Sequence, residues 1–503
     1  MIRGDAKRTP KMELRKRETI VAPLAVVVPV FAMGIITAHL CPALTLFVWA
    51  VLVGASLLAG VVMPRTRVAA VLVGVFAVGG LNTSLRNLDQ AIPLDTPIDA
   101  VVEVVSHSQS AGSADVRVVE WGTAQGQTYR SNKLLKTTYS ADTLLQVGTR
   151  LKCHLRVRPF SQGSYARLMS ARGFVGRSHL EECRVVGHRT SPRSVAARVQ
   201  SAAVSRLQRL GLESDDQTVA EAMVLGCRRG LKGELRDRYA DTGNSHLLAV
   251  SGLHIGLVFV LVNVLLLFLP TLRYGHILKN IAAVILIWAF AFVSGLSPSA
   301  VRAALMFGMM QIGLAVSVEQ NSLNTICGAA LLMLTASPHY LFDVSFQLSF
   351  VAVVGIALWF PLLYSRIRSE SRLLNRVWSL VLVGVCATVA VLPLVAYVFG
   401  RVSLLGVVMG PLLVVLAQIT IVAGLLWCAL PVEALSGVFR SVLGASVGWQ
   451  NDIVGAVARL PFCAVEWRPS MLGVVIIYLA MLAATACLWR VARGRKTQKI
   501  TFE

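Results

Sequence analysis

Runs of about 20 consecutive apolar residues recur along most of this chain and constrain its fold more than any other feature. A run of that length crosses the hydrocarbon core of a bilayer as a helix, because a helix satisfies its own backbone hydrogen bonds where water is absent. Only 15% of the residues are charged, whereas a soluble protein carries about a quarter. The sequence therefore predicts a polytopic α-helical membrane protein.

The apolar runs divide into three before a long polar segment and eight after it. They lie near residues 20–40, 43–63, 68–84, 245–270, 279–295, 299–317, 323–337, 344–363, 377–399, 403–430 and 470–489. The first run is long enough to span and is soon followed by another, which favours a retained helix over a cleaved signal peptide. A weaker segment, 436–459, contains Arg440 and Asp452 and either crosses or lies at the interface. We expect about 10–12 transmembrane helices.

The formal net charge is +22, and membrane topology explains much of it. Lys and Arg accumulate in cytoplasmic loops, and basic residues cluster in the segments 1–18, 64–67, 366–376 and 490–499. This distribution predicts that both termini lie in the cytoplasm, with the polar segment outside. A nucleic-acid partner is compatible with the charge but is not established by it.

The polar segment has the pattern of a small all-β domain. Short alternating stretches at 100–105 and 150–157 predict strands. After it, residues 192–210 carry an apolar stripe that suits a helix on the membrane surface, and 217–239 predicts a second helix. The predicted organisation is a tail and three helices in 1–90, an extracytoplasmic β-rich domain in 91–190, amphipathic connecting helices in 191–241, a polytopic domain in 242–490, and a basic cytoplasmic tail in 491–503.

The first candidate site is the stretch GNSHLLAVSGLHIG at residues 243–256. On a helix, Ser251 and His254 share a face and His246 lies about 80° from His254. Gly252 and Gly256 leave room for close approach by a neighbouring helix. These residues either pack and bond helices together or line a wet cavity, since polar side chains at membrane depth commonly do one or the other.

Two further stretches place polar groups at helix starts. Ser297 and Pro298 predict a helix start, which puts Arg302 in the first or second turn, where it either snorkels to the interface or points into a conduit and pairs with phosphate. Asp343 is expected to be an N-cap. Gln347 is then a candidate for helix bonding or for lining a polar path.

A fourth stretch combines Pro393, Arg401 and Pro411. Prolines break the hydrogen-bond ladder of membrane helices and mark broken helices around some pores, although they are also tolerated for packing.

The order of these stretches resembles the ComEC family of bacterial competence channels. The resemblance rests on GNSHLLAVSGLHIG, SGLSPSAVRAALM, SPHYLFDVSFQLSF and LPLVAYVFGRVSLLG…GP, and extends upstream to SYARLMSARGFVG at 164–176. It implies an inner-membrane channel that passes single-stranded DNA into the cytoplasm during natural transformation, with an extracytoplasmic OB-like domain on a helical pore. The implied channel candidates are His246, Ser251, Gly252, His254, Gly256, Arg302, Asp343, Gln347, Arg401 and Pro411.

The resemblance also implies partners and shows two departures. The expected partners are single-stranded DNA, membrane lipid, a DNA receptor outside, and an ATP-driven motor or DNA-binding proteins inside, because the sequence has no Walker A motif. No cofactor or metal is expected. Many relatives end in a metallo-β-lactamase-like domain, but no HxHxDH motif is present here, so a nuclease is expected to be a separate protein or absent. Gly406 stands where the family often has Asn.

Two other functions remain open at this point. A transporter of another polyanion or envelope precursor uses polar midplane sites on broken helices equally well. An intramembrane hydrolase would use Ser251 or Ser294 with His254. We expect no G-x-S-x-G nucleophile elbow, however, and the sequence contains no HExxH motif. We therefore expect a protein that is not an enzyme.

Cys153 and Cys183 are the two cysteines of the polar segment, on the predicted oxidising side of the membrane. We predict a disulfide between them, since disulfides persist in such compartments. With free thiols alkylated, the chain should migrate differently in electrophoresis with and without reductant. Equal mobility would contradict the bond.

Overall fold

The structure is a computed structural model, and it describes most but not all of the chain. The described residues are 22–41, 44–86, 92–107, 112–122, 127–139, 145–161, 163, 166, 169–170, 172–315, 322–366, 369–403, 405–430, 433–460 and 463–500. The basic tail at 1–18, part of the stretch at 164–176, Arg368 and residues 501–503 lie outside them. For residues 491–500 only the backbone is described.

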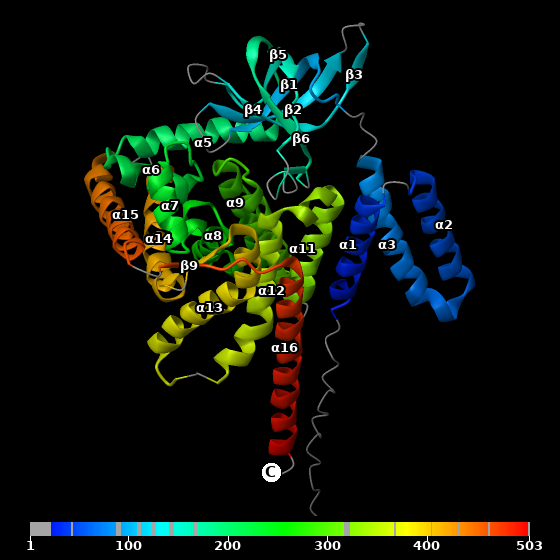
Figure 1. Ribbon diagram of the computed structural model, residues 1–503. Coiled ribbons are helices and arrows are strands. Elements are labelled where there is room, and N and C mark those ends of the chain that lie inside the picture. The colour runs from blue at the N-terminus through cyan, green and yellow to red at the C-terminus, as the bar shows by residue number, and fades with distance from the viewer. Residues whose placement is uncertain are drawn as a thin grey trace, which may run out of the picture.

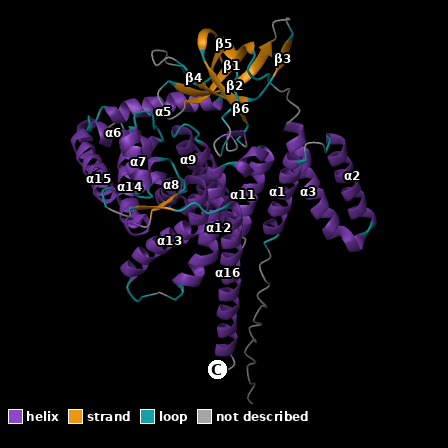
Figure 2. Ribbon diagram, viewed as in Figure 1, coloured by secondary structure: helices purple, strands orange, loops and turns teal. Residues whose placement is uncertain are grey.

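Most of the strands lie apart from the helices. Figure 1 shows the strands of residues 97–188 gathered at one end, the helix α5 (Pro192–Gln208) directly beneath them, and the remaining helices beyond it, with the short strands at 401–403 and 464–466 among those helices. The last helix, α16 (Met471–Ile500), points away from the end that carries the strands. Figure 2 shows the same division between helix and strand.

The β-domain is built around one sheet. Its strands are β1 (Pro97–His107), β2 (Ser113–Gly122), β3 (Thr128–Arg130), β4 (Leu134–Thr138), β5 (Thr149–Arg156), β6 (Phe174–His179) and β7 (Glu181–His188). The order is β6-β4-β2-β1-β5-β7, with β3 on β2 and only the β4–β6 pair parallel. An antiparallel bridge between Arg158, just after β5, and Arg177 of β6 links the two sides of this sheet. Alternating residues such as Val102, Val116 and Leu155 are fully buried and form the core.

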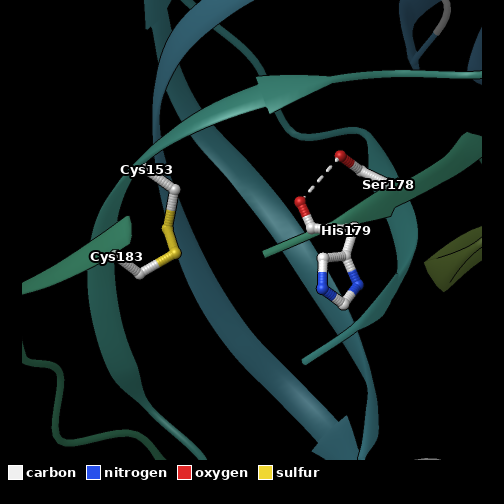
Figure 3. The surroundings of a disulfide bond; sticks show 4 residues. All are labelled: Cys153, Ser178, His179 and Cys183. Carbon is white, nitrogen blue, oxygen red and sulfur yellow. Dashed lines mark hydrogen bonds between the residues drawn. A yellow bond between two sulfur atoms is a disulfide. The ribbon is translucent and has the colours of Figure 1, made fainter. Parts of the chain in front are cut away.

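A disulfide joins Cys153 of β5 to Cys183 of β7, with their Cα atoms 4.4 Å apart (Figure 3). The two strands are antiparallel neighbours, and directly opposite residues lie about this close in a non-hydrogen-bonded pair. Because 30 positions separate the cysteines, the crosslink stabilises the fold by roughly 3–4 kcal/mol in the chain-entropy account.

Three helices precede the β-domain and pack through glycine contacts. They are α1 (Leu24–Leu40), α2 (Leu46–Val62) and, after the 3₁₀ turn η1 (Pro64–Thr66), α3 (Arg67–Arg86). A methyl group on Gly79 of α3 would lie 2.4 Å from the Phe31 carbonyl oxygen, and one on Gly34 of α1 would lie 2.0 Å from the Phe76 carbonyl oxygen. Only residues without a side chain therefore allow α1 and α3 to approach so closely.

The connecting segment forms three helices rather than the predicted two. After α5 come α6 (Ser214–Leu225) and α7 (Gly233–Asp241). The predicted helix over 217–239 is wrong because Gly226 adopts a left-handed conformation (φ 73°) and ends α6.

Tyr239 of α7 donates to the Asn451 side-chain oxygen at 2.9 Å. Burial raises the pKa of Tyr239, which keeps this donor protonated.

The predicted helix over 245–270 starts later than expected. Residues 245–248 form the 3₁₀ turn η2 (Ser245–Leu248), and α8 (Gly252–Leu265) begins with Ser251 as its N-cap. A short η3 (Leu269–Thr271) leads to α9 (Gly275–Val293) and α10 (Pro298–Ala315). Three amides bond α8, α9 and α10 together: Gln311 donates to Asn280 at 2.6 Å and accepts from Asn263 at 3.2 Å.

The remaining helices complete the domain. They are α11 (Ser322–Ala336), α12 (Val344–Tyr364) after the turn η4 (Pro338–Phe342), α13 (Arg372–Phe399), α14 (Leu405–Ala429), α15 (Ser436–Ala458) after η5 (Glu433–Leu435), and α16. Short strands β8 (Arg401–Ser403) and β9 (Ala464–Glu466) pair antiparallel. Both α13 and α14 continue past Pro393 and Pro411, so the prolines do not mark broken helices here. The chain instead turns at Gly400, which has a φ of 69°.

Seven described helices are long and apolar enough to cross a membrane: α3, α8, α9, α12, α13, α14 and α16. The apolar helices α1, α2 and α11 are shorter. These ten helices equal the lower end of the range of 10–12 transmembrane helices predicted from the sequence. The number of membrane spans stays a prediction. The uncertain segment 436–459 is one continuous helix, α15, and its Gln450 is fully buried and donates to Thr420 of α14 at 3.0 Å.

We predict that Gly79→Ala lowers the thermal unfolding midpoint of the detergent-solubilised chain by several degrees, since overpacking costs about 1–3 kcal/mol. The matched control is Gly54→Ala in α2, where an added methyl group meets no atom within 4 Å. That control should leave the midpoint unchanged or raise it slightly, because Ala favours helix over Gly. Equal effects of the two variants would contradict the close α1–α3 contact.

Candidate functional site

Arg302 of α10 is the charged side chain around which the candidate site is built. It is only 2% exposed, which fits a side chain that points into the protein better than one that snorkels to an interface, the two alternatives left open by the sequence. One guanidinium nitrogen donates to the Ser349 hydroxyl of α12 at 3.4 Å. The Nε and Nη1 atoms have no hydrogen-bond partner within the described part of the chain. A buried cation with unused donors is costly in an apolar helical domain and is commonly functional.

Asp343 lies close to Arg302 at the start of α12. It is the N-cap of that helix, as predicted, and accepts from the backbone N–H groups of Ser345 at 2.7 Å and Phe346 at 3.3 Å. Its second oxygen pairs with Arg172 at 2.9 Å. One carboxylate therefore caps the N-terminus of α12 and pairs with an arginine at the same time.

Arg172 comes from the segment between β5 and β6, so this pair joins the β-domain to the helical domain. The contact continues at the next residue, because a methyl group on Gly173 (φ 86°) would lie 3.7 Å from the His339 ring of η4. The sequence alone does not identify Arg172 as a site residue, although it belongs to the stretch at 164–176 quoted above. Its ion pair with Asp343 in the folded chain identifies it.

Gln347 takes a local role beside this group. Its amide donates to the Leu341 carbonyl oxygen at 2.9 Å, which bonds the first turn of α12 back to η4. Arg302, Asp343 and Gln347 therefore come together, with Ser349 and Arg172, in what we call the arginine cluster.

The histidine stretch forms a second group. Ser251 and His254 are in contact: the Ser251 hydroxyl lies 2.8 Å from His254 Nδ1, and the Ser251 backbone N–H donates to the same nitrogen at 3.3 Å. Two donors at Nδ1 place the imidazole proton on Nε2, which has no partner among the described residues although His254 is fully buried. His246 lies in η2, off the helix that carries His254, and is exposed.

The stretch around Arg401 packs against the turn before η2. Gly243 adopts a φ of 74°, and a methyl group there would lie 3.0 Å from Ser403 Cβ. A methyl group on Gly406 would lie 2.6 Å from the Thr242 carbonyl oxygen, so this packing explains glycine where the resemblance suggested Asn. Arg401 pairs with Asp241 at 3.3 Å.

Of the remaining candidates, only Gly256 has a close packing contact among the described residues. It allows the Phe307 ring of α10 to approach α8, since a methyl group would lie 3.0 Å from the ring. A methyl group on Gly252 would meet no atom within 4 Å, so the close approach expected there is not found, and Pro411 lies inside α14. The candidates with polar side-chain contacts therefore lie in the arginine cluster, in the Ser251–His254 pair and in the Arg401–Asp241 pair.

Two observations, one on metal-binding side chains and one on a sequence motif, bear on metal or hydrolase chemistry. Within the described residues no three His, Cys, Asp or Glu side chains come close enough to hold a metal ion. The letters G-x-S-x-G do occur at 444–448, but Ser446 lies inside α15, buried and bonded to Thr420 at 2.9 Å, rather than on a strand-to-helix turn.

Comparison with known proteins identifies the family. The sequence profile described as "Competence protein" matches residues 223–491, just over half of the chain. The chain belongs to the competence protein family. The match begins near the end of α6 and ends within α16, so it contains every candidate residue predicted from the sequence apart from the two disulfide cysteines. Arg172 of the arginine cluster and the β-domain precede it.

Two curated relatives are similar to this member of the competence family over part of their length. ComE operon protein 3 of Bacillus subtilis (strain 168) is 28% identical over 256 residues, which cover 50% of this chain and 30% of that protein. An uncharacterized protein of Aquifex aeolicus (strain VF5) is 34% identical over 131 residues, 26% of this chain and 30% of its own length. No solved structure matches.

We predict that Arg172 and Asp343 are energetically coupled. Arg172→Gln and Asp343→Asn should each lower the thermal unfolding midpoint, and the double variant should lose little more than the worse single one, for a coupling of about 1 kcal/mol. Asn keeps the N-cap function, so this variant removes the charge alone. Arg130→Gln, whose exposed partner Glu120 is 3.9 Å away, is the control without effect. Strict additivity would contradict the contact.

Proposed function

We propose that this member of the competence family is an inner-membrane channel that passes single-stranded DNA into the cytoplasm during natural transformation. The observation that carries the proposal is the unpaired positive charge of the arginine cluster. Arg302 and Arg172 supply two cations and Asp343 one anion, so the cluster has a net charge of +1. Phosphate is a suitable transient partner, because a guanidinium bonds it through two parallel N–H groups.

The position of the cluster supports this proposal. Arg302 lies between α10 and α12, and Asp343 and Arg172 lie where the β-domain meets the helices. A phosphodiester leaving the β-domain would therefore meet charge at the start of the helical path. A charged backbone needs such a polar or basic route, because its transfer into hydrocarbon is costly.

The arrangement of the β-domain supports the rest of the layout. We infer an extracytoplasmic OB-like barrel, because the strand order, the parallel β4–β6 pair and the Arg158–Arg177 bridge suit a small partly closed five-stranded barrel. The opposite ends at which the β-domain and the end of α16 lie (Figure 1) are compatible with a cytoplasmic C-terminus. The proposed partners are a DNA receptor outside and a motor or DNA-binding proteins inside.

The Ser251–His254 contact suggests a second hypothesis, an intramembrane hydrolase, which has less support than the channel. The hydroxyl reaches the histidine at 2.8 Å, but the bond lies within the first turn of α8, where it satisfies a helix end. In the described structure no third group orients the ring through Nε2, as a nucleophile and base arrangement requires. Helix capping explains the contact without chemistry.

We predict that Arg302→Gln lowers the transformation frequency of the source bacterium about tenfold or more. A hydrogen bond to a charged group contributes about 1.5–3 kcal/mol, and 1.4 kcal/mol is a factor of ten. Arg302→Lys keeps the charge but loses the bidentate geometry, so its transformation frequency should lie between those of the unaltered chain and Arg302→Gln. Arg273→Gln, the same change at an exposed position, is the control, and membrane abundance is measured for every strain.

A deletion strain and a restored strain frame this experiment. If deletion abolishes transformation while DNA still binds outside the cell, and the intact chain restores it, the channel proposal stands. Unchanged transformation after deletion would redirect the search for a substrate to another polyanion or an envelope precursor. Normal transformation of the Arg302→Gln strain would contradict a role of the arginine cluster in DNA passage.

A further inference from the structure

Four arginines gather around one glutamate at the base of the β-domain, where the sheet meets α5. They are Arg117 of β2, Arg150 of β5, Arg189 after β7 and Arg193 in the first turn of α5, and the glutamate is Glu103 of β1. We call this group the Glu103 cluster. It shares no residue with the arginine cluster around Arg302.

The register of the sheet brings two of these arginines to the glutamate. Arg117 is the register partner of Glu103 on one side, and Arg150 is its partner on the other. Val102 and Val104 are fully buried in the core, so strand alternation directs Glu103 to the opposite face of the sheet. Glu103 is nevertheless only 5% exposed, which shows that this face is covered at the cluster.

The segment that leads into α5 packs against the turn before β5. A methyl group on Gly148 (φ 91°) would lie 2.6 Å from the Arg189 carbonyl oxygen and 2.9 Å from Ser194 Cβ. From this position Arg189 reaches the carboxylate, with its Nη1 donating to Glu103 Oε2 at 3.2 Å. Arg193 is exposed in the first turn of the helix.

One carboxylate does not neutralise four guanidinium groups. Glu103 Oε2 serves both Arg189 at 3.2 Å and Arg150 at 4.0 Å. Within the described residues neither Arg117 nor Arg193 has an ion pair of its own, and the buried Nε of Arg117 has no hydrogen-bond partner. Burial lowers the pKa of Arg117; Glu103 opposes this shift, and Arg193 and Arg189 add to it. Four cations and one anion give the cluster a net charge of +3.

The helix α5 lies at the level where a membrane around the helical domain would end. The apolar segment of α14 that is long enough to span runs from Met409 to Ala429. Next to its end, Arg206 of α5 donates to the Trp427 carbonyl oxygen at 2.9 Å, and the Trp427 indole donates to the Arg206 carbonyl oxygen at 3.0 Å. Figure 1 shows α5 running between the strands and the helices. Since phospholipid headgroups occupy this level, the Glu103 cluster faces them.

The chemistry of the cluster suits a single phosphate group. A guanidinium bonds phosphate through two parallel N–H groups, and basic sites next to the membrane bind anionic headgroups. Proteins that hold a single strand of nucleic acid combine cations with aromatic rings on which bases stack. No member of the cluster is aromatic, which favours a lipid headgroup over a nucleic acid.

We propose that the Glu103 cluster binds the phosphate of an anionic phospholipid headgroup in the leaflet next to the β-domain. Arg117 and Arg193 bond the phosphate, while Glu103 holds Arg150 and Arg189. The bound headgroup seats the base of the β-domain on the bilayer. This site does not depend on DNA and is independent of the proposed channel.

The test measures binding of phosphatidylglycerol to the full chain in detergent by native mass spectrometry, with zwitterionic phosphatidylcholine as the comparison. Arg117→Gln/Arg193→Gln should raise the Kd of the first phosphatidylglycerol about tenfold, because hydrogen bonds to charged groups contribute enough for that factor. Binding of phosphatidylcholine should be unchanged. The variant keeps Glu103 paired with Arg150 and Arg189, so no buried carboxylate is left alone.

Two further variants separate binding from net charge and from folding. Arg130→Gln/Arg184→Gln removes two exposed charges from β3 and β7 of the same domain and should leave the Kd unchanged. Arg117→Lys/Arg193→Lys keeps both charges, so its Kd should lie between those of the unaltered chain and the Gln variant. Without lipid, the Gln variant should unfold at an equal or higher temperature, since it removes repulsion between like charges.

Three results would overturn the lipid site. The first is equal weakening by Arg117→Gln/Arg193→Gln and Arg130→Gln/Arg184→Gln, which would reduce the effect to net charge. The second is loss of binding of an oligonucleotide of about 12 nucleotides with phosphatidylglycerol unaffected, which would assign the cluster to nucleic acid. The third is binding of inorganic phosphate as tight as that of the lipid and equally lost in the variant, which would assign it to free phosphate.

Discussion

The Asp343 carboxylate is the group on which the relation between the two parts of this protein depends. It accepts two backbone N–H groups at the start of α12 and pairs with Arg172 of the β-domain at 2.9 Å. The first role fixes where α12 begins, and with it Ser349, which contacts Arg302. The second fixes how the segment before β6 meets the helices. A single short side chain thereby pairs with Arg172 and fixes the start of the helix whose Ser349 contacts Arg302.

The apolar helices around this cluster set its energetics. Several polar side chains inside the domain are bonded to one another, as in the Gln311–Asn280 contact between α10 and α9 and the Gln450–Thr420 contact between α15 and α14. Such bonds reduce the cost of burying an amide. Arg302 differs from these amides because it is charged and two of its donors are unused. That contrast distinguishes an interaction that holds helices together from one that is available to a passing anion.

Much of the architecture followed from residue patterns. Apolar runs predicted the helices and alternation predicted the strands, because each pattern is a local property of the backbone. The start of α10 at Pro298 and the N-cap role of Asp343 also followed from local chemistry. The start of α8 did not. Leu247, Leu248 and Val250 lead without a charged residue into the helix that follows, so hydropathy could not show that Gly243 turns the chain and that Ser251 begins the helix.

The sequence by itself determined that the chain is a helical membrane protein with an inserted β-domain, and its motifs indicated the competence family. Only the tertiary structure decided which polar groups meet. Arg172 and Asp343 are separated along the chain by two strands, the connecting segment and the helices α8 to α11. Lys136, Arg177 and Arg158 become neighbours only through a parallel strand pair and a bridge between distant strands. Charges on separate strands give no periodic signal along the chain. Their proximity is a consequence of strand order and domain docking, which depend on packing between segments rather than on any one of them.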